Sequence, residues 1–293
     1  MSPPPPPVSR MAIQSKAGSP GREAPIGVFD SGLGGLTVAR AIHQLLPHED
    51  LVYLGDTARV PYGTKSPATV TRFACEDTEF LVGQKVKAVV VACNSATAWG
   101  LGTLEQHFKL PVMGVILPGA HAALAATRNQ RIGVIGTNAT IRSQAYHAHI
   151  LARSDTARVF ARSTPLLVPL VEEGWTNHAV TLAVLREYLR PLLKQRIDTR
   201  VLGCTHYQLL KRALRQVVGD GVALVDSAES CAADVRERLG SLKLLAVGRR
   251  RKGVIRPFVT DEPERFWDSA ERFLGCATRE PVKVELPSCK WLA

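Results

Sequence analysis

The stretch Ile26-Gly27-Val28-Phe29-Asp30-Ser31 opens the folded part of this chain, and Ile132-Gly133-Val134-Ile135-Gly136-Thr137 shows the same pattern later on. Each stretch is a short apolar run that ends in small or polar residues and precedes a helix-like segment. A short apolar run of this kind is typical of a buried strand. The chain therefore contains two similar halves, each opening with a strand, a loop and a helix.

Each half also contains a later strand that ends in a cysteine. The first is Val89-Val90-Val91-Ala92-Cys93-Asn94-Ser95 and the second is Arg200-Val201-Leu202-Gly203-Cys204-Thr205-His206. One cysteine at a strand end is more often a packing residue than a reactive one. Two cysteines at matching positions of two half-repeats favour a chemical role for the pair.

Strand-like and helix-like segments alternate along the rest of the chain. Near-continuous apolar strands between amphipathic helices are typical of parallel sheets flanked by helices. The predicted strands are residues 26–29, 51–54, 88–92, 112–116, 132–135, 201–202 and 222–225. The clearest predicted helices are residues 36–46, 69–84, 143–151 and 178–193.

We therefore predict an α/β fold with two similar domains, each a mainly parallel sheet flanked by helices. A pseudo-twofold axis would relate the domains and place the active site in the cleft between them, because ligands bind at the carboxyl ends of parallel strands. The predicted segments are a disordered Pro-rich tail (1–25), a first domain (26–117 plus 228–280), a second domain (118–227) and a C-terminal tail (281–293).

The composition is that of a soluble globular protein, with 45% hydrophobic and 22% charged residues. We expect a cytoplasmic protein without a membrane segment, because the chain has neither a secretory signal nor a spanning apolar run. Its six cysteines form no CxxC or zinc pattern, so we expect free thiols and no metal. The net charge of +11 leaves nucleic-acid binding open. The basic run 249–252 favours only a solvated turn, and no nucleic-acid motif accompanies it.

The two cysteines suit a reaction that inverts a stereocentre. Inversion through a planar carbanion needs one proton-transferring group on each face, and a thiol can take or give a proton near neutral pH. Asp30 and His206 each stand near one cysteine block and could exchange a proton with it. The other interpretation of Asp30 is a helix N-cap.

Small and polar residues around these strand ends could hold a substrate. Ser31-Gly32-Leu33-Gly34-Gly35 offers backbone N–H groups to an anion. It is no dinucleotide motif, because Thr37 stands where a glycine is needed. The turn Pro61-Tyr62-Gly63-Thr64 and the neighbours of the cysteines add further donors, which would suit an amino acid with a second carboxylate.

Six ordered blocks of the chain resemble bacterial glutamate racemases. They begin at Ile26 (IGVFDSGLGGLTV), Leu54 (LGDTARVPYG), Ala92 (ACNSATA), Val134 (VIGTNATI), Pro165 (PLLVPLVE) and Leu202 (LGCTHY), and the resemblance extends to about residue 275. Ser95 stands where many members have Thr, and Gln208 where many have Pro.

The resemblance implies cofactor-independent interconversion of L- and D-glutamate, which supplies D-glutamate for peptidoglycan, and it suggests a homodimer. It implies that Cys93 and Cys204 are the acid/base residues, Asp30 assisting Cys93 and both His206 and Glu172 assisting Cys204. The residues implied to contact substrate are Asp30, Ser31, Tyr62, Gly63, Asn94, Ser95, Thr205 and His206. The alternatives are an aspartate racemase, or another enzyme of this fold acting on a carboxylate, and a basic nucleic-acid-binding protein on the same scaffold.

Overall fold

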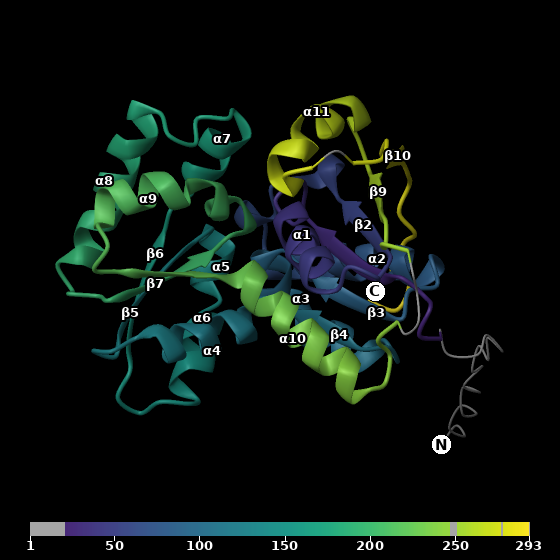
Figure 1. The fold of residues 1–293 in the computed structure, drawn as a ribbon, viewed down its shortest axis with the longest axis horizontal. Helices are drawn as coiled ribbons and strands as arrows, with labels where there is room; N and C mark the ends of the chain where they lie inside the picture. The colour runs from purple at the N-terminus through teal and green to yellow at the C-terminus, as the bar shows by residue number, and fades with distance from the viewer. Residues whose placement is uncertain (1–20, 247–250, 277, 293) are drawn as a thin grey trace, which may run out of the picture.

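The computed structural model describes residues 21–246, 251–276 and 278–292, and it contains two separate parallel sheets. The first sheet has the strand order β10-β9-β2-β1-β3-β4, and the second has the order β6-β5-β7-β8. Figure 1 shows the two sheets side by side, each covered by helices. The predicted α/β fold with parallel, helix-flanked sheets is confirmed.

The strands of the described residues are β1 Ile26–Asp30, β2 Leu51–Gly55, β3 Ala88–Val91, β4 Val112–Gly114, β5 Arg131–Gly136, β6 Arg158–Ser163, β7 Thr199–Gly203, β8 Ala223–Asp226, β9 Ile255–Val259 and β10 Val282–Lys283. The helices are α1 Leu36–Leu45, α2 Pro67–Gly83, α3 Asn94–His107, α4 Ile116–Ala126, α5 Asn138–Arg142, α6 Ala145–Leu151, α7 Leu167–Glu172, α8 Ala179–Leu193, α9 Lys211–Val218, α10 Ser227–Ser241 and α11 Pro263–Leu274. Three short 3-10 helices are η1 Thr57–Arg59, η2 Tyr62–Thr64 and η3 Thr205–Leu210.

The repeat in the sequence corresponds to a repeat in strand order. The series β2-β1-β3-β4 in the first sheet has the same arrangement as β6-β5-β7-β8 in the second. The two openings of the half-repeats are β1 and β5, and the two strands that lead into the cysteines are β3 and β7. In each sheet the cysteine comes just after the end of the corresponding strand. Both cysteines therefore lie at the carboxyl ends of parallel strands.

The first sheet is buried on both faces, as its apolar strands predict. Val28, Tyr53 and Val90 point into a core that continues into the second sheet, while Phe29 and Val91 point into a separate core under α2 and α3. This alternation follows from the two-residue period of a strand. Burial of both faces explains why these strands lack the polar alternation of a half-exposed sheet.

The strands that the sequence analysis missed lie at the edges or far along the chain. β6 is half-exposed and contains three arginine or serine positions, so it has no apolar run to detect. β9 contains Arg256 and Pro257. The predicted strand 112–116 was too long, because Ile116 begins α4. The segment predicted as a C-terminal tail is packed onto the protein, since β10 adds a strand to the first sheet.

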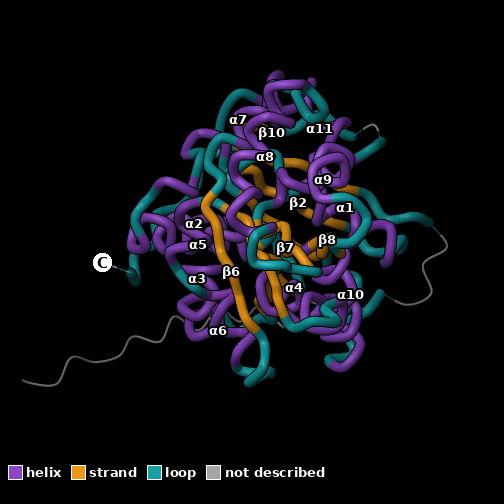
Figure 2. The backbone as a smooth tube through the Cα atoms, turned by 90° about the vertical axis from the view of Figure 1, so that its left-hand side faces the viewer, coloured by secondary structure: helices purple, strands orange, loops and turns teal. Residues whose placement is uncertain are grey.

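Helix α10, together with contacts across the cleft between the two sheets, connects the two halves. α10 packs on α1 beside the first sheet and on α4 beside the second (Figure 1). Viewed from the side, strands β6, β7 and β8 lie among helices α4, α8 and α9 (Figure 2). We call the first sheet with α1, α2, α3 and α11 the first lobe, and the second sheet with α5 to α9 the second lobe. The domain boundaries given above stay a prediction.

Residues 1–20 and 247–250 lie outside the described residues, so most of the Pro-rich tail and part of the basic run do too. Arg251 and Lys252 are exposed, and Arg251 pairs with Asp50 at 2.7 Å. No helix among the described residues has the length and apolar character needed to cross a bilayer.

Candidate active site

Cys93 and Cys204 line the same small cavity between the two lobes. Each of the two cysteine residues is 6% exposed, and the cavity has a volume of about 30 Å³. Cys93 immediately precedes α3 and Cys204 immediately precedes η3. The residues around the cavity are Ser31, Val60, Pro61, Tyr62, Gly63, Cys93, Asn94, Ser95, Thr137, Val168, Cys204, Thr205 and His206. Both cysteines are therefore part of the lining of one cavity.

The Cys93 side of the cavity is buried and contains the carboxyl group of Asp30. The thiol lies 3.8 Å from Ser31 Oγ, to which it donates. Burial raises the pKa of the Cys93 thiol, and the nearby Asp30 carboxylate adds to this effect. Together they raise the pKa to about 12. At neutral pH Cys93 is therefore a protonated thiol, in the form that donates a proton.

Asp30 ends β1 and is almost fully buried. Its carboxylate accepts hydrogen bonds from Gly32 N at 3.1 Å and from Thr205 Oγ1 at 3.4 Å. Burial raises the pKa of this carboxyl above its usual value, against the opposing effect of His206. Asp30 does not cap α1, which begins at Leu36 after Gly35. The sequence suggested that the backbone N–H groups of this loop bind an anion. One of them, the Gly32 N–H, is already bound by Asp30.

The Cys204 side of the cavity contains a chain of three groups. Cys204 Sγ lies 3.8 Å from His206 Nδ1, and His206 Nε2 lies 3.1 Å from Glu172 Oε1. Burial disfavours the charged ring, but the contacts with Cys204 and Glu172 outweigh it and raise the pKa of His206 to about 10. Burial opposes the effect of His206 on Glu172, yet the net result is a lowered pKa for that carboxyl. At neutral pH the pair is an imidazolium and a carboxylate.

Asn94 and Ser95 connect the site to the second lobe. Asn94 Oδ1 accepts from the Tyr146 hydroxyl at 2.8 Å, and Ser95 Oγ lies 2.9 Å from Thr137 Oγ1. The Nδ2 group of Asn94 is buried and has no hydrogen-bond partner among the described residues. A buried donor without a partner is costly, and a ligand carboxylate in the cavity would satisfy it.

Tyr62 lines the cavity, but its hydroxyl group faces elsewhere. The hydroxyl donates to Asp56 and to Asp77, the latter at 2.9 Å, in a buried cluster that Arg59 also joins. The sequence analysis placed Tyr62 among the substrate contacts. In the structure, only the ring and backbone of Tyr62, and not its hydroxyl group, are free to contact a substrate.

Two residues on the second lobe were missed as site residues. Thr137 and Val168 both line the cavity. Thr137 holds the position in the second half-repeat that Ser31 holds in the first, so the repeat contained a signal for it. Val168 begins no motif of its own, and only the packing of α7 brings it to the cavity.

The remaining cysteines do not line this cavity. Burial raises the pKa of the Cys75 and Cys231 thiols well above the usual value, which is typical of packing residues. Among the described residues, no group of three or more His, Cys, Asp or Glu side chains is arranged to hold a metal ion.

The family model for Asp/Glu/Hydantoin racemases matches residues 26–235, which contain both cysteines and all the named site residues. The chain belongs to this racemase family. Glutamate racemase from Geobacter metallireducens is 49% identical over 265 residues, which are 90% of this chain and 98% of that protein.

Solved structures of racemases share the fold. A glutamate racemase isoform from Bacillus anthracis has a TM-score of 0.87 and 39% identity, covering 91% of this chain and 99% of its own. The Francisella tularensis glutamate racemase, solved in complex with D-glutamate, has a TM-score of 0.83 and 35% identity, covering 90% and 98%.

Proposed function

We propose that this racemase interconverts L- and D-glutamate with Cys93 and Cys204 as the two proton-transferring groups and without a cofactor. The observation that carries the proposal is the placement of both thiols, from equivalent strand ends of the two sheets, on one cavity. The names of the closely similar relatives supply the substrate.

The reaction transfers two protons, one from the α-carbon to one sulfur and one from the other sulfur to the α-carbon, and changes no oxidation state. A thiolate on one face removes the α-proton and becomes a thiol, which leaves a planar carbanion. The thiol on the other face donates its proton to that carbon and becomes a thiolate, so the configuration is inverted and the charges are exchanged between the two sulfur atoms. The opposite enantiomer of the substrate reacts with the same two cysteines, with their roles exchanged.

The surroundings of the two cysteines suggest which groups assist each of them. The Cys93 thiol lies beside Asp30 and is protonated at neutral pH, so it is suited to donate. Cys204 Sγ lies 3.8 Å from His206 Nδ1, and Glu172 holds the other side of that ring. In the proposed function, Asp30 assists Cys93, and His206 and Glu172 assist Cys204.

Donors around the cavity would anchor the two carboxylates of glutamate. The unpartnered Nδ2 of Asn94 is the clearest of these donors. The further contacts in the proposal are Ser31, Gly63, Ser95, Thr205 and the ring or backbone of Tyr62. In this proposal the enzyme acts in the cytoplasm, where its D-glutamate serves peptidoglycan synthesis, and it forms a homodimer.

Racemisation in deuterated water tests the proposal directly. The purified full chain is given L-glutamate, D-glutamate, L-aspartate or D-aspartate, and optical inversion and deuterium at the α-carbon are followed. We expect inversion with deuterium incorporation for glutamate and a far slower reaction for aspartate. The reverse preference would make the chain an aspartate racemase, and inversion lost on exhaustive dialysis but restored by pyridoxal phosphate or a metal ion would reject the cofactor-free scheme.

Substitution of each cysteine tests the two-base scheme. We expect Cys93→Ala and Cys204→Ala each to reduce racemisation by at least about 10³-fold, because each removes one of two required proton carriers. Cys231→Ala, a buried cysteine away from the cavity, is the matched control and should retain turnover. Near-normal turnover in either active-site variant would disprove the scheme.

A further inference from the structure

The C-terminal segment, residues 284–292, packs against the core that lies under α2 and α3. The residues of the segment that contact this core are Val284, Leu286, Cys289, Trp291 and Leu292. Cys75, which lies in α2, belongs to the same core. The segment lies beyond residues 26–235, which the family model matches, and the proposed function gives it no role.

Two interactions fix how this segment lies on the helices. Trp291 Nε1 donates to Glu79 Oε1 at 3.0 Å, and the Trp291 ring stacks on His107 of α3. Glu79 follows Cys75 by four residues on α2, so both side chains lie on one helix face, about 6 Å apart along the axis. Cys289 precedes Trp291 by two residues, which span about 6–7 Å in an extended chain. Because the two spacings match, the contact of Trp291 with Glu79 brings Cys289 to Cys75.

The thiols of Cys75 and Cys289 act on each other. Burial is the largest cause of the raised pKa of both thiols. Their mutual interaction raises the pKa of Cys75 and lowers that of Cys289, as expected when the Cys75 thiol donates to the Cys289 sulfur. Cys75 is fully buried, whereas Cys289 is only partly buried. Cys289 is therefore the thiol that a reagent in solution reaches first.

We propose that Cys75 and Cys289 form a redox site, at which a small-molecule disulfide such as glutathione disulfide oxidises the two thiols to one reversible disulfide bond. Cys289 lies outside regular secondary structure, so its backbone can adjust to the geometry that a disulfide requires. Two other cysteines outside the candidate active site are placed differently. Cys231 lies in the other core, and Cys276 is exposed beyond the end of α11.

The oxidation proceeds by two thiol–disulfide exchanges. Cys289 loses its proton to solvent, and its thiolate attacks one sulfur of the oxidant, which forms a mixed disulfide and releases one small thiolate. Cys75 then loses its proton, and its sulfur attacks the Cys289 sulfur and releases the second small thiolate. The two small thiolates take up the two protons. Two protein thiols are thereby oxidised to one disulfide, and one small disulfide is reduced to two thiols.

The disulfide fixes the C-terminal segment to α2 and closes a loop between residues 75 and 289. A crosslink that closes a long loop stabilises a fold by restricting the unfolded chain. Helix α2 also carries Asp77, whose carboxylate accepts from the Tyr62 hydroxyl at 2.9 Å. The crosslink therefore holds the helix that supports the Tyr62 side of the candidate active site. In a reducing compartment both thiols stay free, and the bond forms when small disulfides accumulate.

Peptide mapping of the full-length protein tests the disulfide. The protein is incubated with glutathione disulfide, the remaining free thiols are alkylated, and the tryptic peptides are analysed by mass spectrometry. We expect peptide 73–85, which contains Cys75, to be joined to peptide 284–290, which contains Cys289, and dithiothreitol to separate them. The proposal is overturned if Cys289 stays free, stops at the mixed disulfide with glutathione, or joins Cys276 instead.

Thermal unfolding of variants tests whether this bond stabilises the protein. We expect oxidation to raise the unfolding midpoint of the unchanged protein by about 4 °C or more. Cys276→Ser, at an exposed cysteine outside the pair, is the matched control and should show the same joined peptides and the same shift, whereas Cys289→Ser should show neither. A shift of equal size in Cys289→Ser would overturn the proposal. Cys93 and Cys204 lie on other tryptic peptides, so any oxidation of the active-site thiols is measured separately.

Discussion

At the scale of single residues, the two sides of the cavity differ in charge although the two cysteines are equivalent in the repeat. Cys93 lies beside a carboxylate, and Cys204 lies beside an imidazole that Glu172 holds. The half-repeat thus places like nucleophiles in unlike surroundings. Such a difference lets one sulfur give a proton while the other takes one.

Glu172→Gln should move the alkaline limit of activity to lower pH. His206 has a pKa raised from 6.5 to about 10, so in the folded protein its proton is present at neutral pH and is lost as the pH rises through about 10. Removing the carboxylate charge removes one of the two contacts that raise this pKa. The profile of kcat/KM against pH and the ring titration of His206 by nuclear magnetic resonance would measure the shift.

Glu173→Gln is the control for this prediction, because Glu173 is the exposed neighbour at the end of the same helix. Its profile should match that of the unchanged protein. An identical pH profile for Glu172→Gln would show that the carboxylate does not act through His206.

At the scale of elements, two glycines set how closely the lobes approach. A Cβ atom at Gly34 would lie 2.6 Å from His206 Nδ1, and one at Gly63 would lie 2.6 Å from Thr137 Cβ. Neither glycine has a positive φ. Both positions therefore require glycine because another element lies close by, rather than because of their backbone conformation.

Gly34→Ala should reduce turnover by at least about tenfold, since the added methyl group pushes η3 and its His206 away from the Asp30 loop. Kinetics and thermal unfolding would measure the effect. Gly102→Ala is the control, because Gly102 lies in α3 with open space around it. It should keep full activity and gain about 0.5–1 kcal/mol of stability. Equal activity of both variants would contradict a close-contact role for Gly34.

A second element-scale prediction concerns Arg200 in the middle of the second sheet. Its side chain is fully buried, and its three guanidinium nitrogens have no hydrogen-bond partner among the described residues. Burial lowers its pKa to about 10. A buried cation without a partner destabilises the fold.

Arg200→Met should therefore raise the free energy of unfolding by about 1–3 kcal/mol, as measured by urea denaturation. Arg256→Met, at an exposed position of β9, should change it by less than about 0.5 kcal/mol. A loss of stability in Arg200→Met would mean that the guanidinium has a favourable partner in solution.

At the scale of the whole molecule, the lobes are in contact across the active-site cavity. Trp99 Nε1 donates to Ala139 O at 3.1 Å, and the Ser95–Thr137 and Asp30–Thr205 contacts also cross the cleft. The cavity of about 30 Å³ has room for roughly two water molecules. In the proposed function, glutamate therefore reaches the two cysteines only when the lobes separate, and the homodimer predicted from the resemblance must leave that movement free.

The C-terminal segment, which lies beyond residues 26–235 matched by the family model, stabilises the first lobe. Trp291 stacks on His107 with ring centroids 3.4 Å apart and donates from Nε1 to Glu79 at 3.0 Å. Trp291→Ala should lower the free energy of unfolding by about 2 kcal/mol, as measured by thermal or urea unfolding. Trp267→Ala, at a partly exposed position of α11, should have a smaller effect, and equal effects would contradict a specific role for Trp291.

The sequence by itself determined the α/β class, the repeat and the cysteine pair. These features are local, because a buried strand needs a run of apolar residues and a motif needs residues next to each other in the chain. The strand order confirmed that the two openings and the two cysteine strands correspond. The family resemblance added Glu172, which has no signal of its own in the local pattern.

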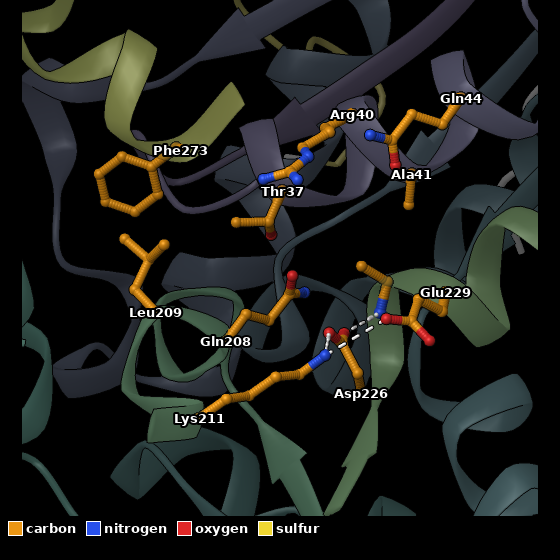
Figure 3. A pocket seen from close by; sticks show the side chains of 11 residues that line it. Thr37, Arg40, Ala41, Gln44, Gln208, Leu209, Lys211, Asp226, Glu229 and Phe273 are labelled. Carbon is orange, nitrogen blue, oxygen red and sulfur yellow. Dashed lines mark hydrogen bonds and ion pairs between the residues drawn. The ribbon is translucent and has the colours of Figure 1, made fainter. Parts of the chain in front are cut away.

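Only the tertiary structure decided what each side chain faces. It directed the Tyr62 hydroxyl to Asp56 and Asp77, gave a loop N–H group to Asp30, and brought Thr137 and Val168 to the cavity. It also brought α1, η3, α10 and α11, which are distant in the sequence, around a second cavity (Figure 3). These contacts depend on how two separately formed sheets pack against each other, and that packing joins residues with no common period or spacing along the chain.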